Sequence, residues 1–234
     1  MLNLQFSMPV DASCRILCLG AHSDDIEIGC GGTVLTLLDS CPHAEFYWVV
    51  FSADQQRACE AHTSAHSFLQ HAQVKQIVVK DFRESFFPYV GAAIKEYFEQ
   101  VQRAFSPDLI FTHSRSDVHQ DHRLISELTW NTFRNHLILE YEIPKYDGDL
   151  GVPSVFVPLS ESMYRKKLQY ILDSFRSQHN KAWFDQETFL SLLRLRGIEC
   201  NAPSKYAEAF YCRKAVLTCA NHSSFDSPPR RSKD

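Results

Sequence analysis

The sequence predicts an α/β fold with a Rossmann-like, mostly parallel sheet flanked by helices. In the first half of the 234 residues, short runs rich in β-branched and aromatic residues alternate with longer segments of helical period, which is the pattern of βα units. The short runs are continuously apolar, as in strands that are covered on both faces. Right-handed crossovers between such strands gather the loops at their carboxyl ends on one edge, where a ligand is expected.

The expected elements follow from these patterns in chain order. Strands are predicted at residues 15–20, 45–52, 76–80 and 107–112, and helices at 29–40, 56–72, 90–105 and 119–136. After residue 137, two strands at 139–143 and 154–158 flank a turn-rich segment. Two helices, at 161–174 and 184–197, and a last strand at 207–217 complete the prediction, with Gly197 as the C-cap of the second helix.

Length and composition exclude several classes of protein. The length and the absence of a linker predict a single domain over residues 1–220, followed by a polar tail at 221–234 that we expect to be mobile. A formal net charge of -4 gives no broad attraction for nucleic acid or an anionic membrane surface. Eight scattered cysteines without a C-x-x-C pair favour buried thiols in a reducing compartment over a disulfide framework. Without a signal-peptide pattern or an apolar run of eighteen residues, we expect a cytoplasmic protein that does not insert into membranes.

The strongest local signal lies where the first predicted strand ends. There His22, Asp24 and Asp25 stand almost side by side in Gly20-Ala-His-Ser-Asp-Asp-Ile-Glu27. Buried carboxylates cost several kcal/mol unless a cation or hydrogen-bond donors compensate them. A bound metal ion supplies that compensation, and catalytic zinc takes about three protein ligands of this kind. A helix N-cap with a satisfied polar turn is the alternative interpretation of this cluster alone.

A second cluster follows the fourth predicted strand, in Thr112-His-Ser-Arg-Ser-Asp-Val-His-Gln-Asp-His122. His119 and His122 are three residues apart at the expected start of a helix and therefore share one face. One of them can bind a metal ion while the other faces a substrate. Two such clusters, each at the end of a predicted strand, make a metal site the better interpretation.

These two motifs resemble those of the LmbE-like, or PIG-L-type, zinc N-deacetylases, which read A-H-P-D-D-E and H-x-D-H. The matching segments are Ala21-His22-Ser23-Asp24-Asp25 and His119-Gln120-Asp121-His122. The resemblance implies a Rossmann-like fold over roughly residues 14–217, one Zn²⁺ per chain bound by His22, Asp25 and His122, and Asp24 as the general base. It also implies that His119 stabilises the oxyanion or protonates the leaving amine, and that Asp121 orients His119. Another divalent metal would fit the same ligands.

The chain departs from the family pattern in two places. Ser23 replaces the usual proline, which affects no ligand. Asp117 stands where some relatives carry a tyrosine, so we expect it to bind substrate hydroxyls instead. Arg57 follows the second strand and is expected either to hold sugar hydroxyls or to pair with Glu60 on its helix. Tyr146, in the polar and aromatic segment 142–149, is expected to stack on a sugar ring.

Other candidates have simpler interpretations. The glycines of residues 29–32 lack the G-x-G-x-x-G spacing of a dinucleotide site and are expected to allow close packing. His62, His66 and His71 are expected on a solvated helix face. Cys30 and Cys59 have no base nearby in the sequence and are interpreted as packing residues, not nucleophiles.

The sequence therefore predicts a zinc-dependent amide hydrolase that removes the acetyl group from an N-acetylated amino sugar, such as an N-acetylglucosamine glycoside, glycolipid precursor or nucleotide sugar. A metal-dependent hydrolase of another small amide and a non-catalytic sugar-binding relative are the alternatives. The expected partner is a small acetamido sugar and not nucleic acid. The sequence leaves open which sugar is used and whether the chain forms a homo-oligomer.

Overall fold

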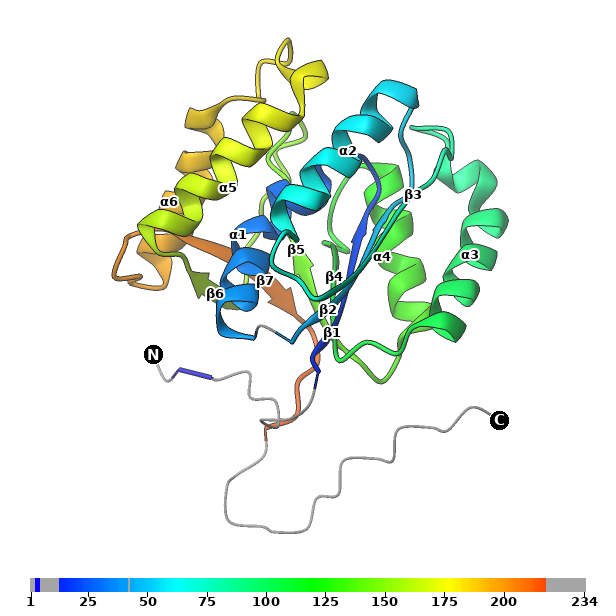
Figure 1. The fold of residues 1–234 in the computed structure, drawn as a ribbon, viewed down its shortest axis with the longest axis horizontal. Coiled ribbons are helices and arrows are strands. Elements are labelled where there is room, and N and C mark those ends of the chain that lie inside the picture. Colours follow the sequence, from blue (N-terminus) through cyan, green and yellow to red (C-terminus); the bar gives the residue numbers. More distant parts are fainter. Residues whose placement is uncertain (1–2, 5–12, 42, 218–234) are drawn as a thin grey trace.

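The computed structural model describes residues 3–4, 13–41 and 43–217, and it confirms the predicted α/β fold (Figure 1). Seven strands form one sheet in the order β3-β2-β1-β4-β5-β7-β6. The pairs among β1 to β5 are parallel, whereas β7 is antiparallel to both β5 and β6. The strands are β1 (Arg15–Gly20), β2 (Glu45–Val50), β3 (Val74–Val79), β4 (Leu109–His113), β5 (Leu137–Tyr141), β6 (Val155–Pro158) and β7 (Ala207–Cys212).

Helices cover both faces of the sheet, and those of the described residues form two groups. On one face lie α1, α2, α5 and α6, and on the other lie α3 and α4 (Figure 1). The α-helices are α1 (Asp25–Ser40), α2 (Gln55–Phe68), α3 (Gly91–Ala104), α4 (Gln120–Thr132), α5 (Glu161–Ser174) and α6 (Gln186–Glu199), and short 3₁₀ helices span Phe87–Val90 and Arg176–Gln178.

The central strand β1 shows why its sequence is continuously apolar. Successive side chains of a strand point to opposite faces. Ile16 and Cys18 therefore belong to the core beneath α1, α2, α5 and α6, while Leu17 and Leu19 belong to the core beneath α3 and α4. All four side chains are fully buried. A strand between two helical layers has no solvent-facing side on which polar residues could alternate.

Two buried charges from the C-terminal half support the middle of α1. The Glu208 carboxylate accepts the backbone N–H groups of Gly32 and Thr33 at 2.8 and 2.6 Å, and it forms an ion pair with Lys167 at 2.6 Å. The Lys167 ammonium also donates to the carbonyl of Ile28 at 2.7 Å. Strand β7 and helix α5 thus supply partners for polar groups of the helix that follows β1.

The boundaries differ from the predicted ones at several points. Helix α6 continues to Glu199, so the C-cap prediction for Gly197 is wrong. A Cβ at Gly197 would lie 2.2 Å from the carbonyl oxygen of Lys205, which explains why glycine stands there. The last strand ends at Cys212 and not at residue 217. Strands β5 and β6 do not pair with each other, because β7 lies between them.

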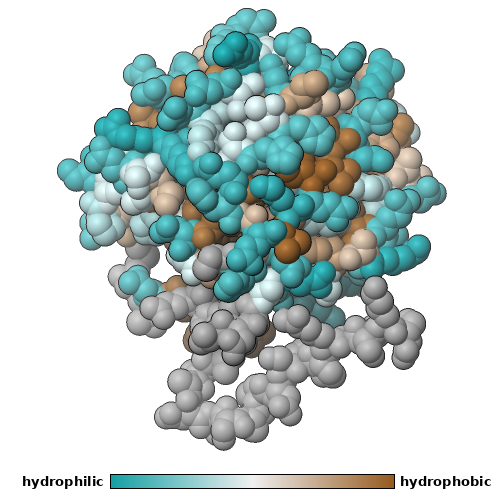
Figure 2. Space-filling view, viewed as in Figure 1, coloured by the Kyte–Doolittle hydropathy of each residue, from teal (hydrophilic) through white to brown (hydrophobic). Residues whose placement is uncertain are grey.

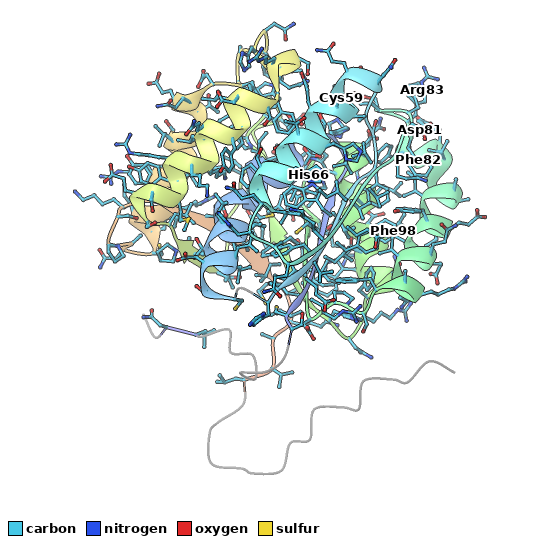
Figure 3. All side chains as sticks on the ribbon, in the orientation of Figure 1. Cys59, His66, Asp81, Phe82, Arg83 and Phe98 are labelled. Carbon is cyan, nitrogen blue, oxygen red and sulfur yellow. The ribbon has the colours of Figure 1, made fainter. Side chains whose placement is uncertain are left out.

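The exposure of individual side chains confirms the prediction for the histidines of the second helix and contradicts the one for Cys59. The face seen in Figure 2 is largely hydrophilic with scattered apolar patches. His62 and His71 are exposed, the first on α2 and the second just after it. His66 is also exposed on α2 (Figure 3). Cys30 is buried, but Cys59 is exposed on α2, so the packing interpretation of Cys59 is wrong (Figure 3). The seven cysteines within the described residues are all free.

The expected tail at 221–234 lies outside the described residues. None of the helices in the described part of the chain combines the length and apolar character needed to cross a membrane.

Candidate metal centre

The two polar clusters meet at the carboxyl edge of the sheet. Strands β1 and β4 are parallel neighbours, and β1 ends at Gly20 while β4 ends at His113. His22 lies in the turn after β1, Asp25 begins α1, and His122 lies in the first turn of α4. Loops at the carboxyl ends of adjacent parallel strands converge, so clusters about a hundred residues apart in sequence become neighbours.

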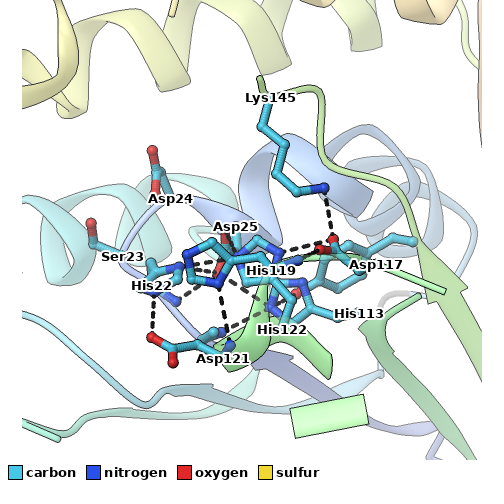
Figure 4. A network of polar contacts seen from close by, with 12 residues as sticks. His22, Ser23, Asp24, Asp25, His113, Asp117, His119, Asp121, His122 and Lys145 are labelled. Atoms are coloured by element: carbon cyan, nitrogen blue, oxygen red, sulfur yellow. Dashed lines mark hydrogen bonds and ion pairs between the residues drawn. The ribbon is translucent and has the colours of Figure 1, made fainter. Parts of the chain in front are cut away.

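The three expected ligands place their donor atoms close together (Figure 4). His22 Nδ1 lies 3.1 Å from His122 Nε2 and 3.4 Å from an oxygen of Asp25, and His122 Nε2 lies 3.5 Å from the other oxygen. Donors about 2.0–2.2 Å from a tetrahedral zinc ion lie roughly 3.3–3.6 Å apart. All three side chains are buried. Imidazole and carboxylate donors of this kind suit a divalent metal ion, and the two histidines face different oxygens of Asp25.

The charges around these ligands also suit a cation. Burial lowers the pKa of His22, but the charge of Asp25 and hydrogen bonds to Asp121 and Asp25 outweigh it and raise the pKa to about 10. The surrounding carboxylates thus favour positive charge at this point. Burial and the neighbouring His113 lower the pKa of His122 to about 3, so its ring is neutral and can offer a lone pair to a metal ion.

His113 belongs to this cluster, although the sequence analysis gave it no role. It is fully buried, its Nε2 lies 3.2 Å from an oxygen of Asp25, and its ring stacks on His122 with centroids 3.9 Å apart. Asp25, His113 and His122 form one set of side chains able to share an ion, and His22, His119 and His122 form another. The available signal was its position: His113 ends an otherwise apolar strand at the functional edge.

Asp121 contacts a different histidine from the one expected. Its carboxylate lies 3.2 Å from His22 Nε2 and also accepts the backbone N–H groups of Ser85 and Phe87, at 2.6 and 3.2 Å. Among the described hydrogen bonds, the His119 ring receives the backbone N–H of Asp121 and not a contact from its carboxylate. The geometry thus corrects the expected pairing: the Asp121 carboxylate orients His22.

Asp117 also differs from the expectation, because both of its carboxylate oxygens contact other residues of the protein. One oxygen accepts the backbone N–H of His119 at 2.8 Å, and the other lies 2.9 Å from His122 Nδ1 and 3.1 Å from the Lys145 ammonium. Burial alone would raise the pKa of Asp117, but the hydrogen bond and charge of His122, with His113 and Lys145, hold it well below its usual range. Because both oxygens are occupied, the expectation that Asp117 binds hydroxyls is not supported. Its contacts are those of a carboxylate that orients a metal-binding histidine.

Asp24 has fewer partners than Asp25, Asp117 and Asp121, the other carboxylates of this cluster. It is buried, and within the described residues its Oδ2 has no hydrogen-bond partner. It precedes α1 without capping it. Burial and the adjacent Asp25 raise the pKa of Asp24 to about 6, while Arg57 and His22 act in the opposite direction. A carboxylate with a free oxygen and a pKa near neutrality has the properties of a general base.

Arg57 lies beside Asp24 and is held by other groups. Its guanidinium is 3.8 Å from Asp24, donates to the Ser23 hydroxyl at 3.1 Å and forms an ion pair with Glu84 at 2.6 Å. The alternative pairing with Glu60 is absent from the described contacts, since Glu60 accepts from Ser177 instead. Arg57 thus flanks the candidate base, and its expected contact with sugar hydroxyls stays a prediction.

His119 is the N-cap residue of α4 and is half-buried. Its Nδ1 accepts the backbone N–H of Asp121 at 3.3 Å, which leaves the ring proton on Nε2. Burial and the charge of His22 lower the pKa of His119, so the ring is a neutral hydrogen-bond donor. The centroid of the His119 ring lies 5.0 Å from that of the His22 ring.

Tyr146 is 75% exposed, and its expected stacking on a sugar ring stays a prediction.

Comparison with known families identifies the chain. A family model described as PIG-L, GlcNAc-PI de-N-acetylase, matches residues 17–133, which is half of the chain and includes both polar clusters. The chain belongs to the PIG-L family. The LmbE-like, or PIG-L-type, resemblance of its two motifs is thereby confirmed. A comparison with curated protein sequences gives no match.

Solved structures share the fold of this PIG-L family member at low identity. The N,N'-diacetylchitobiose deacetylase from Pyrococcus horikoshii is 22% identical with a TM-score of 0.65, over 87% of this chain and 85% of that one. The zinc-inhibited form of teicoplanin deacetylase Orf2 is 12% identical with a TM-score of 0.63, over 85% and 97%. GalB, the 4-carboxy-2-hydroxymuconate hydratase from Pseudomonas putida KT2440, is 16% identical with a TM-score of 0.70, over 88% and 98%. Because both deacetylases and a hydratase have this fold, the reaction must be argued from the site.

Proposed function

We propose that the chain is a metal-dependent hydrolase that removes the acetyl group from an N-acetylated amino sugar, giving acetate and a free amine. The observation that carries this proposal is a buried Asp24 whose Oδ2 has no hydrogen-bond partner in the described structure. It lies in the same short segment as His22 and Asp25, whose donor atoms converge with that of His122. A site that only bound sugars would not need a poised base beside metal ligands. Membership of the PIG-L family supports the same reaction class.

We propose zinc as the metal, because two imidazoles and one carboxylate suit it, although iron(II) or cobalt would fit the same donors. His22, Asp25 and His122 would hold it. When bound, such an ion acidifies water and polarises a carbonyl group. Asp121 and Asp117 would keep the rings of His22 and His122 oriented toward it, since each carboxylate faces the ring nitrogen that does not face the other ligands.

The remaining residues would move protons and stabilise charge. Asp24 accepts a proton from the attacking water through its free oxygen, and water adds to the amide carbonyl carbon. His119 donates a hydrogen bond from Nε2 to the carbonyl oxygen as negative charge develops there. When the carbon–nitrogen bond breaks, Asp24 passes its proton to the amine nitrogen, so the products are acetate and the amino sugar. One base and one donor thus satisfy the proton balance of amide hydrolysis.

The cysteines of the described residues are all free, which supports a reducing compartment, so we place this activity in the cytoplasm.

The test compares wild type, Asp24→Asn and the matched control Asp39→Asn, which changes an exposed carboxylate at the other end of α1. Bound metal and acetate release are measured with N-acetylglucosaminides and with N-acyl amino acids. We expect stoichiometric metal in all three proteins, and acetate from the sugars with wild type and Asp39→Asn only. The loss in Asp24→Asn should be about 10²- to 10⁴-fold in kcat.

The other outcomes separate the alternatives. Preferential cleavage of N-acyl amino acids would show that the substrate is another small amide and not an acetamido sugar. Tight sugar binding with bound metal and no acetate would favour a non-catalytic relative. Full activity in Asp24→Asn would remove Asp24 as the base.

A further inference from the structure

The segment 144–150 lies between β5 and β6 and approaches the metal centre (Figure 4). Among the described residues, no backbone–backbone hydrogen bond involves residues 142–153. Within 144–150, the side chains that form hydrogen bonds in the described structure are those of Lys145 and Asp149. The ends of the segment have other anchors, because Pro144 is buried, the Gly151 N–H donates to the Tyr211 hydroxyl and the Gly151 carbonyl accepts from Arg196. Lys145 and Asp149 therefore hold the part of the segment between these two ends.

Lys145 joins the segment to the metal centre through a chain of charges. Its ammonium lies 2.6 Å from both oxygens of Asp149 and 3.1 Å from the oxygen of Asp117 that also contacts His122 Nδ1. The exposed fractions of the Lys145, Asp149 and Asp117 side chains are only 9%, 9% and 3%. A cation between two nearly buried carboxylates is far harder to remove than a surface ion pair, because both negative charges would be left unpaired.

The two carboxylates are not held equally. Asp117 keeps the backbone N–H of His119 and the ring of His122 if Lys145 is neutralised. Asp149 keeps only the backbone N–H of Val118, at 2.8 Å. Repulsion between the carboxylates should therefore displace Asp149, and with it the segment, while Asp117 stays in place.

We propose that Lys145 is a positioning residue that fastens the segment 144–150 to the metal centre by bridging Asp117 and Asp149. Because Tyr146 follows Lys145 directly, this bridge also fixes where the exposed Tyr146 ring lies relative to the ligands. If the proposed function holds, the bridge sets the affinity for the sugar and not the rate of bond cleavage. Lys145 touches no reacting atom and acts through the segment.

Two adjacent backbone amides report on this arrangement separately. The Val118 amide donates to Asp149 on the segment, whereas the His119 amide donates to Asp117. Faster hydrogen exchange at Val118 alone signals release of the segment. Faster exchange at His119 signals movement of Asp117.

The experiment uses the full metal-loaded chain as wild type, Lys145→Met and Lys145→Arg, with Lys95→Met as the matched control. Lys95 also pairs with a carboxylate four residues later, Glu99, but on the surface of α3. Amide exchange is followed by NMR, metal affinity by chelator competition, and KM and kcat by acetate release from N-acetylglucosaminides.

For Lys145→Met we expect at least about tenfold faster exchange at Val118, with His119 and the metal Kd changed by less than about threefold. KM should rise about tenfold with kcat nearly constant. Lys145→Arg should restore most of this behaviour, and Lys95→Met should change none of it.

Unchanged Val118 exchange and unchanged KM in Lys145→Met would overturn the proposal. So would faster exchange at His119 together with weaker metal binding, because Lys145 would then hold Asp117 and not the segment. If wild type releases no acetate from any amide, the proposed function fails, but exchange and metal affinity still decide the role of Lys145.

Discussion

Replacing Asp117 with asparagine tests whether this carboxylate orients a metal ligand or binds substrate. In the structure one oxygen accepts from His119 and the other from His122. An asparagine of the same shape has one acceptor and one donor. If its oxygen faces His122, its NH₂ opposes the N–H of His119. If its NH₂ faces His122 Nδ1, the proton of that ring must move to Nε2, the atom that faces the other ligands.

Either orientation weakens metal binding. Loss of a carboxylate that orients a metal-binding histidine typically costs 10- to 100-fold in metal affinity. At about 1.4 kcal/mol for each factor of ten, the expected cost is about 1.4–2.8 kcal/mol. We therefore expect the metal Kd of Asp117→Asn to rise by one to two orders of magnitude.

The assay is chelator competition on wild type, Asp117→Asn and Asp149→Asn. The last is a matched control, because Asp149 also contacts Lys145 but touches none of the metal ligands. Its metal Kd should stay within about threefold of wild type. Wild-type metal affinity in Asp117→Asn, accompanied by a raised KM, would refute this reasoning and restore Asp117 as a substrate-binding residue.

Three further predictions concern other parts of the chain. His119→Ala should keep its metal and lose about 10²- to 10³-fold in kcat, as measured by metal content and acetate release; equal loss of both would make His119 a ligand. Tyr146→Ala should raise KM for acetamido sugars if the ring stacks on them, and an unchanged KM would remove Tyr146 from the binding site. Gly29→Ala places a Cβ 2.2 Å from the ring of Tyr141, whose hydroxyl is fixed to a buried carbonyl, so it should lower stability by about 1–3 kcal/mol and Tm by several degrees. Gly91→Ala, which meets only ordinary contacts, is its control, and equal Tm values would show that Tyr141 can move.

The sequence predicted the parallel half of the fold well, because its signals are local. β1 and α5 have the predicted limits, at residues 15–20 and 161–174, and the other elements of the first half are displaced by only a few residues. Continuous apolar runs mark strands covered on both faces, and this condition is visible within each segment. The meeting of the two polar clusters could be predicted for the same reason, since each motif directly follows such a run.

The antiparallel end of the sheet could not be read in this way. The insertion of β7 between β5 and β6 pairs residues that are far apart in sequence, such as Tyr141 with Phe210 and Val155 with Phe210. No local pattern specifies which strand fills that place. Gly197 was misassigned for a related reason: its need for glycine comes from the approach of Lys205 and not from the end of its own helix.

Sequence spacing also could not predict which carboxylates contact the candidate ligands His22 and His122. Asp121 precedes His122 by one residue and follows His119 by two, yet it faces His22, which arrives from another loop. Asp117 forms an ion pair with Lys145, which lies in the segment after β5. Which side chains meet across loops depends on the placement of whole elements, whereas a motif fixes only its own spacing.

The support that Glu208 and Lys167 give to α1 has a consequence for synthesis of the chain. Both candidate metal-binding motifs lie before residue 123, but the carboxylate that accepts the Gly32 and Thr33 amides arrives with the last strand. The helix that carries Asp25 therefore reaches its final packing only near the end of translation. We expect a nascent chain that has both motifs but not yet β7 to hold metal weakly, so that loading of the ion follows completion of the sheet.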